Sequence, residues 1–408
     1  MKADQNVPER NQWLPYDPSC TPPELMASLR RTTLASGSES NEPLALPTSR
    51  LTPHSDPSLP LHWLQGRTVL LFGDHVERQH NRDFCNLSGG VFTTIALDHP
   101  LSPPRFENGI DEKVAPGNQT NFDDSRPSVC YIEKYDFMVV TVFHYGLANR
   151  VEFERESLFR SEHFYPPGAS LAPRCLRPYP NPPLNAVAMS DRLSHIAIPL
   201  LSSLHRPQPD LIEFSSGFWD LRHFTALDEQ HGADPFSELT TERLQWYSDR
   251  LSHSLSDLQS SFPGTPLLWR SLHHPPKFSN TPFSRVAALD HLSRKVIADL
   301  NRNRRGGTHL SSPPLFKQGR PSASRRRKPP PRERESSHAP FLNLVKGRIG
   351  KKERIRDAPA VGVGHGLARK IRINEWGRLM LGQEHLMRDT VTAPLPGGYV
   401  WGDIMLFE

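Results

Sequence analysis

The sequence predicts an α/β fold, a three-layer α/β/α sandwich with a mostly parallel central sheet. Short apolar segments alternate after residue 62 with stretches of helical periodicity, which is the order that parallel strands and right-handed crossover helices produce. The first apolar segment, residues 68–72, is followed by Gly73 and Asp74. Such a segment is typical of a strand that is buried on both faces at the centre of a sheet.

Further strands are expected where β-branched and aromatic residues cluster and turn residues follow. These segments are residues 91–97, 136–143, 211–214 and 266–270. Helices are expected from the turn at Asp74 to Cys85 and wherever apolar residues recur every three or four positions. The periodic stretches are residues 186–204, 238–258 and 286–300. Apolar and aromatic residues return at 371–376 and 399–407, so the last part of the chain is also expected to be folded.

Composition divides the chain into four parts. Only 36% of the 408 residues are hydrophobic and 41 are proline, so a sizeable part of the chain cannot bury enough apolar surface to form a core. We expect an extended Pro/Ser-rich leader over residues 1–62 and a basic disordered insertion over residues 302–365. The folded core is expected to comprise residues 63–301 and 366–408.

The net charge of +5 comes from the insertion. Of the 49 Lys and Arg and the 44 Asp and Glu residues, 17 and three fall within residues 302–356, which leaves 32 basic and 41 acidic residues elsewhere. The run at 325–332 has the composition of a nuclear-localisation or nucleic-acid-binding tract, but it lacks interleaved aromatic residues. Nucleic acid is therefore expected as a partner only through residues 302–356, and a passive insertion is favoured.

The four cysteines, Cys20, Cys85, Cys130 and Cys175, are far apart. Their spacing gives no zinc site and no thioredoxin-like motif, so no metal or cofactor is predicted. Disulfides and free buried thiols are equally compatible with it. The chain has no run of about 18 apolar residues and no apolar signal region near its start. We therefore expect no transmembrane segment and, for the sequence as written, a cytoplasmic location.

Ligand sites in open parallel sheets gather at the carboxyl ends of the strands. Three turns are therefore candidates, at residues 73–78, 217–220 and 389–392. His273 and His274 also follow a predicted strand, and we interpret them as loop residues rather than as catalytic residues or metal ligands.

Two blocks of the sequence resemble the SGNH (GDSL-type) hydrolases. Residues 70–78, Leu-Leu-Phe-Gly-Asp-His-Val-Glu-Arg, match the family's strand ending in Gly-Asp-Ser with an Arg three positions after the Ser. Residues 389–392, Asp-Thr-Val-Thr, match its C-terminal Asp-x-x-His. Other segments, such as 219–221, 268–276 and 374–378, are similar to fungal members of the branch that holds PC-esterases and trichome-birefringence-like acetyltransferases. The resemblance spans residues 63–300 and 366–408.

The resemblance implies a catalytic site from which two side chains are missing. His75 occupies the slot of the nucleophilic serine and Thr392 the slot of the base, while Asp389 matches the orienting carboxylate. His385, one helical turn from Asp389, is a substitute base, although a solvated helical carboxylate is the simpler interpretation of Asp389.

The resemblance also implies oxyanion or substrate contacts in the other blocks. These positions are Asp74, Arg78, Gly146, Gly217, Trp219 and Asp220. Trp219 stands where the family has an amide donor, and Gly146 matches a glycine that donates its backbone N–H. Arg78 could clamp an acidic group or form an internal salt bridge.

Three functions are compatible with this sequence. The favoured one is a catalytically impaired SGNH-like protein that retains a pocket for an acylated carbohydrate or similar ester. The alternatives are an active ester hydrolase or O-acetyltransferase with a rearranged site around His75, Asp389 and His385, and a binding protein that acts through the basic insertion. Members of the family often carry a signal or anchor ahead of the domain, which implies the secretory pathway or Golgi if the N-terminus is incomplete.

Overall fold

A computed structural model describes just over half of the chain. The described residues are 24–34, 46, 56–96, 99–103, 126–155, 188–274, 282–305, 370–381 and 395–407. Within them, seven strands form one sheet in the order β2-β3-β4-β1-β5-β6-β7. The strands are β1 (Thr68–Gly73), β2 (Val91–Thr94), β3 (Ser128–Ile132), β4 (Phe137–Phe143), β5 (Leu211–Phe214), β6 (Leu267–Arg270) and β7 (Arg372–Asn374).

Five of the strands are parallel, and β1 lies near the centre of the sheet. β1 pairs in parallel with β4 on one side and β5 on the other, and β6 and β7 continue the parallel order. β3 runs antiparallel to both β4 and β2. The prediction of an α/β fold with a mostly parallel sheet is therefore confirmed. The chain passes from β4 to β5 across β1, which makes the carboxyl end of β1 the point where such sheets bind ligands.

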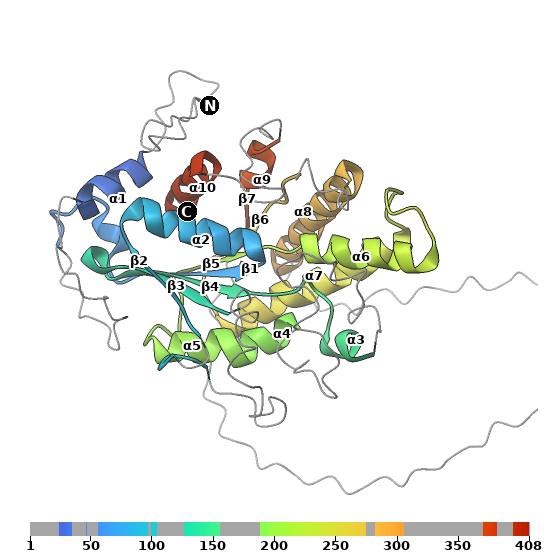
Figure 1. Cartoon of the computed structure of the whole chain (residues 1–408), viewed down its shortest axis with the longest axis horizontal. Helices are drawn as coiled ribbons and strands as arrows, with labels where there is room; N and C mark the ends of the chain where they lie inside the picture. Colours follow the sequence, from blue (N-terminus) through green and yellow to red (C-terminus); the bar gives the residue numbers. More distant parts are fainter. Residues whose placement is uncertain are drawn as a thin grey trace, which may run out of the picture. The chain divides into compact units, whose positions relative to one another are not determined.

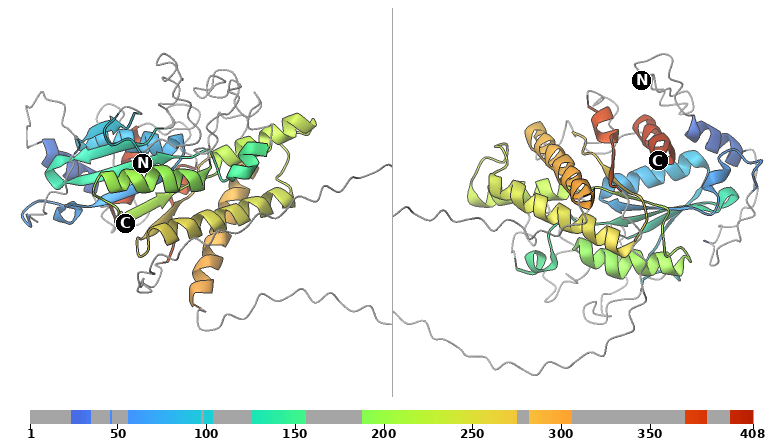
Figure 2. Two further views of the ribbon diagram at one scale, coloured as in Figure 1. Left: turned by 90° about the horizontal axis from the view of Figure 1, so that it is seen from below. Right: turned by 180° about the vertical axis from the view of Figure 1, so that it is seen from behind.

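Helices lie on both sides of the sheet, as Figures 1 and 2 show. Their bounds are α1 (Leu25–Leu34), η2 (His62–Leu64), α2 (His75–Ser88), η5 (Glu133–Tyr135), α3 (Arg150–Arg155), α4 (Met189–Arg192), η8 (Leu193–Ala197), α5 (Ile198–Ser203), α6 (Phe218–His231), α7 (Thr241–Ser261), α8 (Phe283–Arg305), α9 (Trp376–Leu379) and α10 (Leu395–Phe407). In Figure 1, α2 and α10 lie above the sheet and α5 and α7 below it.

Alternate side chains of β1 enter two separate cores because successive residues of a strand point to opposite faces. Leu70 and Phe72 pack with residues of α5, α7 and α8. Val69 and Leu71 pack instead with residues of α1, α2 and α10. All six residues of β1 are buried, which explains why its sequence shows no alternation of apolar and polar residues.

Helix α7 confirms the helix that the periodicity of residues 238–258 predicts. Tyr247, Leu251, Leu255 and Leu258 are fully buried on one face and join the core that contains Phe72. Predicted helix 186–204 is also present, as α4, the single π-helical turn η8 and α5 in succession. The strands expected at 91–97, 136–143, 211–214 and 266–270 correspond to β2, β4, β5 and β6.

Two elements differ from the expectation. Residues 25–34 were expected to be part of an extended leader, and that is wrong: they form α1, whose Met26 and Leu29 are fully buried against α2 and α10. Met26 N donates to Asp403 Oδ1 at 2.8 Å, which ties α1 to the last helix. At the other boundary, α8 continues to Arg305, so the first four residues of the predicted insertion are helical.

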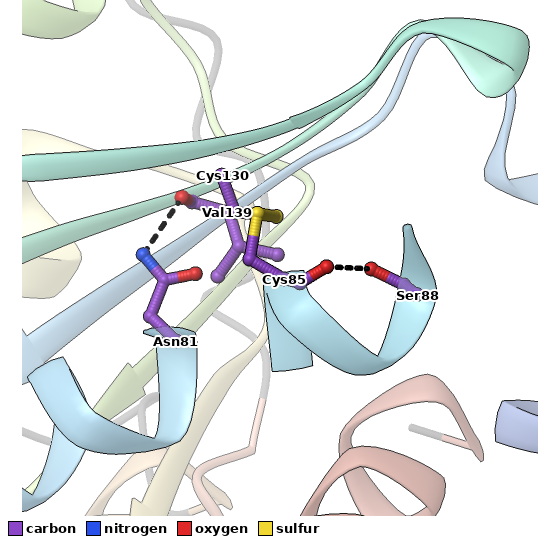
Figure 3. The surroundings of a disulfide bond; sticks show 5 residues. All are labelled: Asn81, Cys85, Ser88, Cys130 and Val139. Carbon is purple, nitrogen blue, oxygen red and sulfur yellow. Dashed lines mark hydrogen bonds between the residues drawn. A yellow bond between two sulfur atoms is a disulfide. The ribbon is translucent and has the colours of Figure 1, made fainter. Parts of the chain in front are cut away.

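A disulfide between Cys85 and Cys130 joins α2 to β3 (Figure 3). Next to it, Asn81 Nδ2 donates to Val139 O at 3.2 Å and Ser88 Oγ donates to Cys85 O at 3.2 Å. A Cβ atom on Gly90 would lie 3.0 Å from both sulfur atoms, so the turn after α2 passes close to the bond. Of the two cysteine states left open by the sequence, this pair adopts the disulfide. Cys20 and Cys175 lie outside the described residues.

Candidate functional site

The carboxyl ends of the five parallel strands bring their turns together. His144 N donates to Gly73 O at 2.8 Å, and Ser215 N donates to Phe72 O at 3.1 Å, so the turns after β4 and β5 flank the turn after β1. Ser271 N donates to Asn374 O at 2.9 Å and joins the turns after β6 and β7. We call this region the carboxyl edge.

His75 is the first residue of α2 and lies at the carboxyl edge. Asp74 caps the helix: its Oδ1 accepts from Val76 N at 2.8 Å, while its own N–H donates to Glu77 Oε2 at 3.0 Å. This reciprocal capping box fixes the turn. The His75 side chain is 32% exposed, and its Nδ1 lies 3.7 Å from Asp74 Oδ1. Burial raises the pKa of the Asp74 carboxyl above its ordinary value.

The turn requires glycine at position 73. A Cβ atom there would lie 2.2 Å from Glu77 Oε2, because the Glu77 side chain folds back over the end of β1 to reach the Asp74 N–H. Any side chain at position 73 would therefore break the capping box. The Gly-Asp pair that marks this strand end is thus set by the geometry of helix entry, independently of any chemistry at His75.

A fully buried ion pair lies beneath the turn. Arg270, at the end of β6, donates from Nε to Glu77 Oε1 and from Nη2 to Ser215 Oγ at 2.8 Å. Ser215 Oγ in turn donates to Glu77 Oε1 at 2.7 Å. Although burial raises it, the pKa of Glu77 is held at about 2 by the Arg270 charge. The Ser215 hydroxyl is buried and engaged on both sides, so it is not presented to a ligand.

The backbone N–H of Gly146 is hydrogen-bonded within the protein. His144 Nε2 lies 2.8 Å from Ser215 O, so Nε2 carries the ring proton and Nδ1 accepts the Gly146 N–H at 3.1 Å. Burial lowers the pKa of His144 to about 4, which keeps this ring neutral. Gly146 has a φ of 90°, and a Cβ atom there would lie 2.8 Å from Asp220 Oδ1. The N–H that the resemblance assigns to an oxyanion is therefore bonded within the protein.

Asp220 is also used internally. Its Oδ1 accepts from Leu147 N at 2.7 Å and its Oδ2 from Ser216 Oγ at 2.5 Å, so it joins the turns after β4 and β5. Burial raises its pKa to about 6. Gly217 is the N-cap residue of α6, and a Cβ atom on it would lie 2.6 Å from Leu272. Trp219 is half-buried against Tyr145, with their ring centroids 5.2 Å apart.

Under the same edge, α10 is anchored to the sheet by a second buried carboxyl. Glu213 of β5 accepts from Asn374 Nδ2 at 2.6 Å and from Trp401 Nε1 at 2.8 Å. Burial raises its pKa to about 7. The His80 ring stacks on Trp401 with centroids 4.7 Å apart and meets Trp376 edge-on at 4.4 Å. Neither His80 nitrogen has a hydrogen-bond partner among the described residues.

A pocket of about 260 Å³ opens beside β6. Its apolar walls include Leu272, whose side chain also covers Gly217, together with the exposed Phe283 and Leu381. Its polar lining comes from His274, Asp290, His291, Arg294 and Arg378. We call it the β6 pocket. Asp290 and Arg294 are paired with each other at 2.8 Å, and Arg294 also binds Glu375, which lies outside the lining. These two carboxylates offset the two arginines of the wall, Arg294 and Arg378.

The structure thus brings together most of the candidate site residues that lie within the described part of the chain. Asp74, His75, Gly146, Gly217, Trp219 and Asp220 meet at or next to the carboxyl edge, and Arg78 is half-buried one turn into α2. Asp389, Thr392 and His385 lie outside the described residues, as does most of the basic insertion. Glu77, Arg270, Glu213 and His80 were not identified from the sequence as parts of this region.

Within the described ranges, no three potential metal ligands gather into one group, and no helix has the length and apolar character needed to cross a membrane. Comparison with family models, with curated proteins and with solved structures found no match for this chain.

Proposed function

We propose that this chain is an SGNH-hydrolase-like protein that binds an acylated carbohydrate or a similar ester at the carboxyl edge without hydrolysing it. One observation supports this most strongly: the side chain presented at the head of α2 is His75, where serine-dependent ester hydrolysis needs an Oγ nucleophile. The serines of the neighbouring turn, Ser215 and Ser216, are buried and hydrogen-bonded and do not replace it.

The backbone N–H groups that could stabilise an oxyanion during acyl transfer are also bonded to other groups of the protein. An oxyanion is stabilised by donors that are pre-aimed at the developing charge. Here the Gly146 N–H binds His144, the Leu147 N–H binds Asp220, and Trp219 stands in place of an amide side chain. A turn built in this way favours recognition over catalysis.

The β6 pocket supports binding. It adjoins Gly217 through Leu272 and combines the apolar surfaces of Phe283 and Leu381 with polar side chains of both signs. Ligand sites are generally concave, mostly apolar and supplied with a few polar groups that orient the ligand. Because Asp290 and the adjoining Glu375 offset the two arginines of the wall, a neutral ligand such as an acylated sugar suits it better than an ion.

The test uses an acetylated xylo-oligosaccharide, with the deacetylated oligosaccharide as its control. We expect calorimetry to detect binding of the acetylated form only and NMR to show no release of acetate. Phe283→Ala should weaken binding, whereas Phe236→Ala should not, because Phe236 is exposed to a similar extent (56% against 54%) but lies outside the pocket. Acetate release, or equal binding by both variants, would overturn the proposal.

An active enzyme is the second candidate, and one observation favours it. His75 Nδ1 lies 3.7 Å from the buried carboxylate of Asp74, and the ring is partly exposed, so the pair resembles a carboxylate-oriented imidazole. In this alternative His75 acts as nucleophile or base in ester hydrolysis or O-acetyl transfer. Loss of acetate release on replacing His75 by Ala would support it.

A further inference from the structure

A second concave site lies at the opposite edge of the sheet. A groove of about 930 Å³ runs along the amino ends of the parallel strands, between the last helix and the loop that precedes β6. Its floor is formed by residues that are themselves almost completely buried: Leu64, Val69, Phe137, Leu211, Met405 and Leu406. We call it the amino-edge groove. Its volume lies in the range of small-molecule sites, roughly 300–1,000 Å³.

The rim of the amino-edge groove is cationic. Arg67, Lys370 and Arg372 line it and are exposed, whereas Asp210 is its only acidic lining residue among those described. Three cations against one carboxylate leave an excess of two positive charges. Asp210 Oδ2 already accepts the Thr68 N–H at 2.9 Å. Within the described residues neither Arg67 nor Lys370 forms a salt bridge.

An aromatic side chain also lines the groove. Trp63 of η2 is 36% exposed, and the Arg67 guanidinium lies over its ring at 6.0 Å from the centroid. An aromatic ring next to a guanidinium group suits a ligand that has both a flat apolar body and a strongly anionic group.

We propose that the amino-edge groove binds a phosphate monoester with a flat apolar body. A phosphate monoester carries about −1.5 to −2 charges at neutral pH, which matches the excess of two positive charges better than a single carboxylate does. Guanidinium groups bind phosphate through paired charge-assisted hydrogen bonds, and Arg67 and Arg372 supply two of them. Trp63 would hold the apolar body and Lys370 would add a further charge.

This site is independent of the carboxyl edge. The groove is lined by residues of η2 and α10 and by residues at or next to the first positions of β1, β4, β5, β6 and β7, whereas His75 follows the last residue of β1. Replacing His75 by Ala should therefore leave binding in the groove unchanged, and failure of either proposal leaves the other standing.

The experiment titrates the full chain with 1-naphthyl phosphate by calorimetry at low salt. Inorganic phosphate and 1-naphthol are the two controls, since each carries half of the proposed chemistry. We expect 1-naphthyl phosphate to bind more tightly than either, and its affinity to fall as salt is raised.

Variants of the rim provide the specificity test. Arg67→Gln and Arg372→Gln should each lower the affinity for 1-naphthyl phosphate by roughly tenfold, the loss of one charge-assisted contact. Trp63→Ala should lower it while leaving the affinity for inorganic phosphate unchanged. Arg302→Gln, which removes an exposed cation of α8, is the matched control and should have no effect. Binding of 1-naphthol as tight as that of the phosphate, or undiminished binding by the Arg67→Gln/Arg372→Gln double variant, would overturn the proposal.

Discussion

Arg270 and Glu77 form an ion pair that is entirely buried directly beneath the turn that carries His75. The two residues are 193 positions apart in the sequence, so this contact ties the end of β6 to the first turn of α2. The same Glu77 carboxylate accepts the Asp74 N–H, and the ion pair therefore holds the backbone that presents His75.

Removal of one partner of this pair should destabilise the whole fold. Arg270→Met leaves the Glu77 carboxylate buried and without its cation, and we expect the free energy of unfolding in urea to fall by about 3–5 kcal/mol. The double variant Arg270→Met/Glu77→Gln should lose less, because it buries no unpaired charge. Arg302→Met, at a side chain that is 76% exposed, should change stability by less than about 0.5 kcal/mol. A similar loss in the two single variants would contradict this account.

Glu213 should make stability depend on pH. Burial raises its pKa in the folded protein to about 7 from an ordinary value of 4.5, so the folded state binds more protons than the unfolded state between these two values. This contribution to stability is fully present below about pH 4.5 and is lost as the pH rises towards 7.

Glu213→Gln removes that titration and retains one acceptor oxygen in place of the two that bind Asn374 Nδ2 and Trp401 Nε1. We expect the unfolding free energy of the variant, measured relative to the unmodified protein, to rise between pH 4.5 and 7 by up to about 3 kcal/mol. Glu238→Gln, at an exposed glutamate, is the control and should show no such trend. A difference that is flat with pH for Glu213→Gln would show that this carboxyl is ionised throughout the range.

The disulfide should contribute a large share of the stability of the sheet edge. Cys85 and Cys130 are 45 residues apart, and closing a loop of that length stabilises a fold by about 2–4 kcal/mol. Cys85→Ala/Cys130→Ala should therefore lower the melting temperature, and a reducing agent should lower that of the unmodified protein in the same way. The reducing agent should not change the melting temperature of the double variant. If it lowers that temperature as much as it lowers that of the unmodified protein, the effect belongs to other cysteines.

Much of the fold was predictable because its strands are buried on both faces and read as apolar runs. β1, β5 and β6 lie within a residue of their predicted bounds, and the helical face of α7 follows from its periodicity. β3 was missed, although all five of its residues are buried, because it is separated from β4 only by a short 3₁₀ turn. α1 was missed because ten residues with three buried positions give a weak signal inside a Pro/Ser-rich leader.

The interior of the candidate site could be predicted only in part. Sequence motifs identified the turns at His75 and Gly217, because glycine and the capping aspartate are local features. The partners of Glu77 and Glu213 could not be identified, since pairing across 193 and 161 positions is a property of the assembled sheet. One signal was present: Glu213 and Arg270 interrupt otherwise apolar strands, and charged residues in buried strands require partners.

Placing the family's serine and histidine at positions 75 and 392 tests whether these two positions face each other, as the resemblance implies. His75→Ser with Thr392→His should create hydrolysis of p-nitrophenyl acetate on the order of 100-fold faster than His75→Ser alone, the lower end of what a positioned general base contributes. The single variant is the control for any non-specific effect of the serine. Equal rates would show that position 392 does not face the turn after β1.

The most direct test of the proposed function is the initial rate of p-nitrophenyl acetate hydrolysis by the unmodified protein and by His75→Ala. Both proteins should hydrolyse the ester at the background rate of a buffer that contains the same concentration of free imidazole. A rate above that background for the unmodified protein, abolished in His75→Ala, would contradict the account and establish His75 as a catalytic residue.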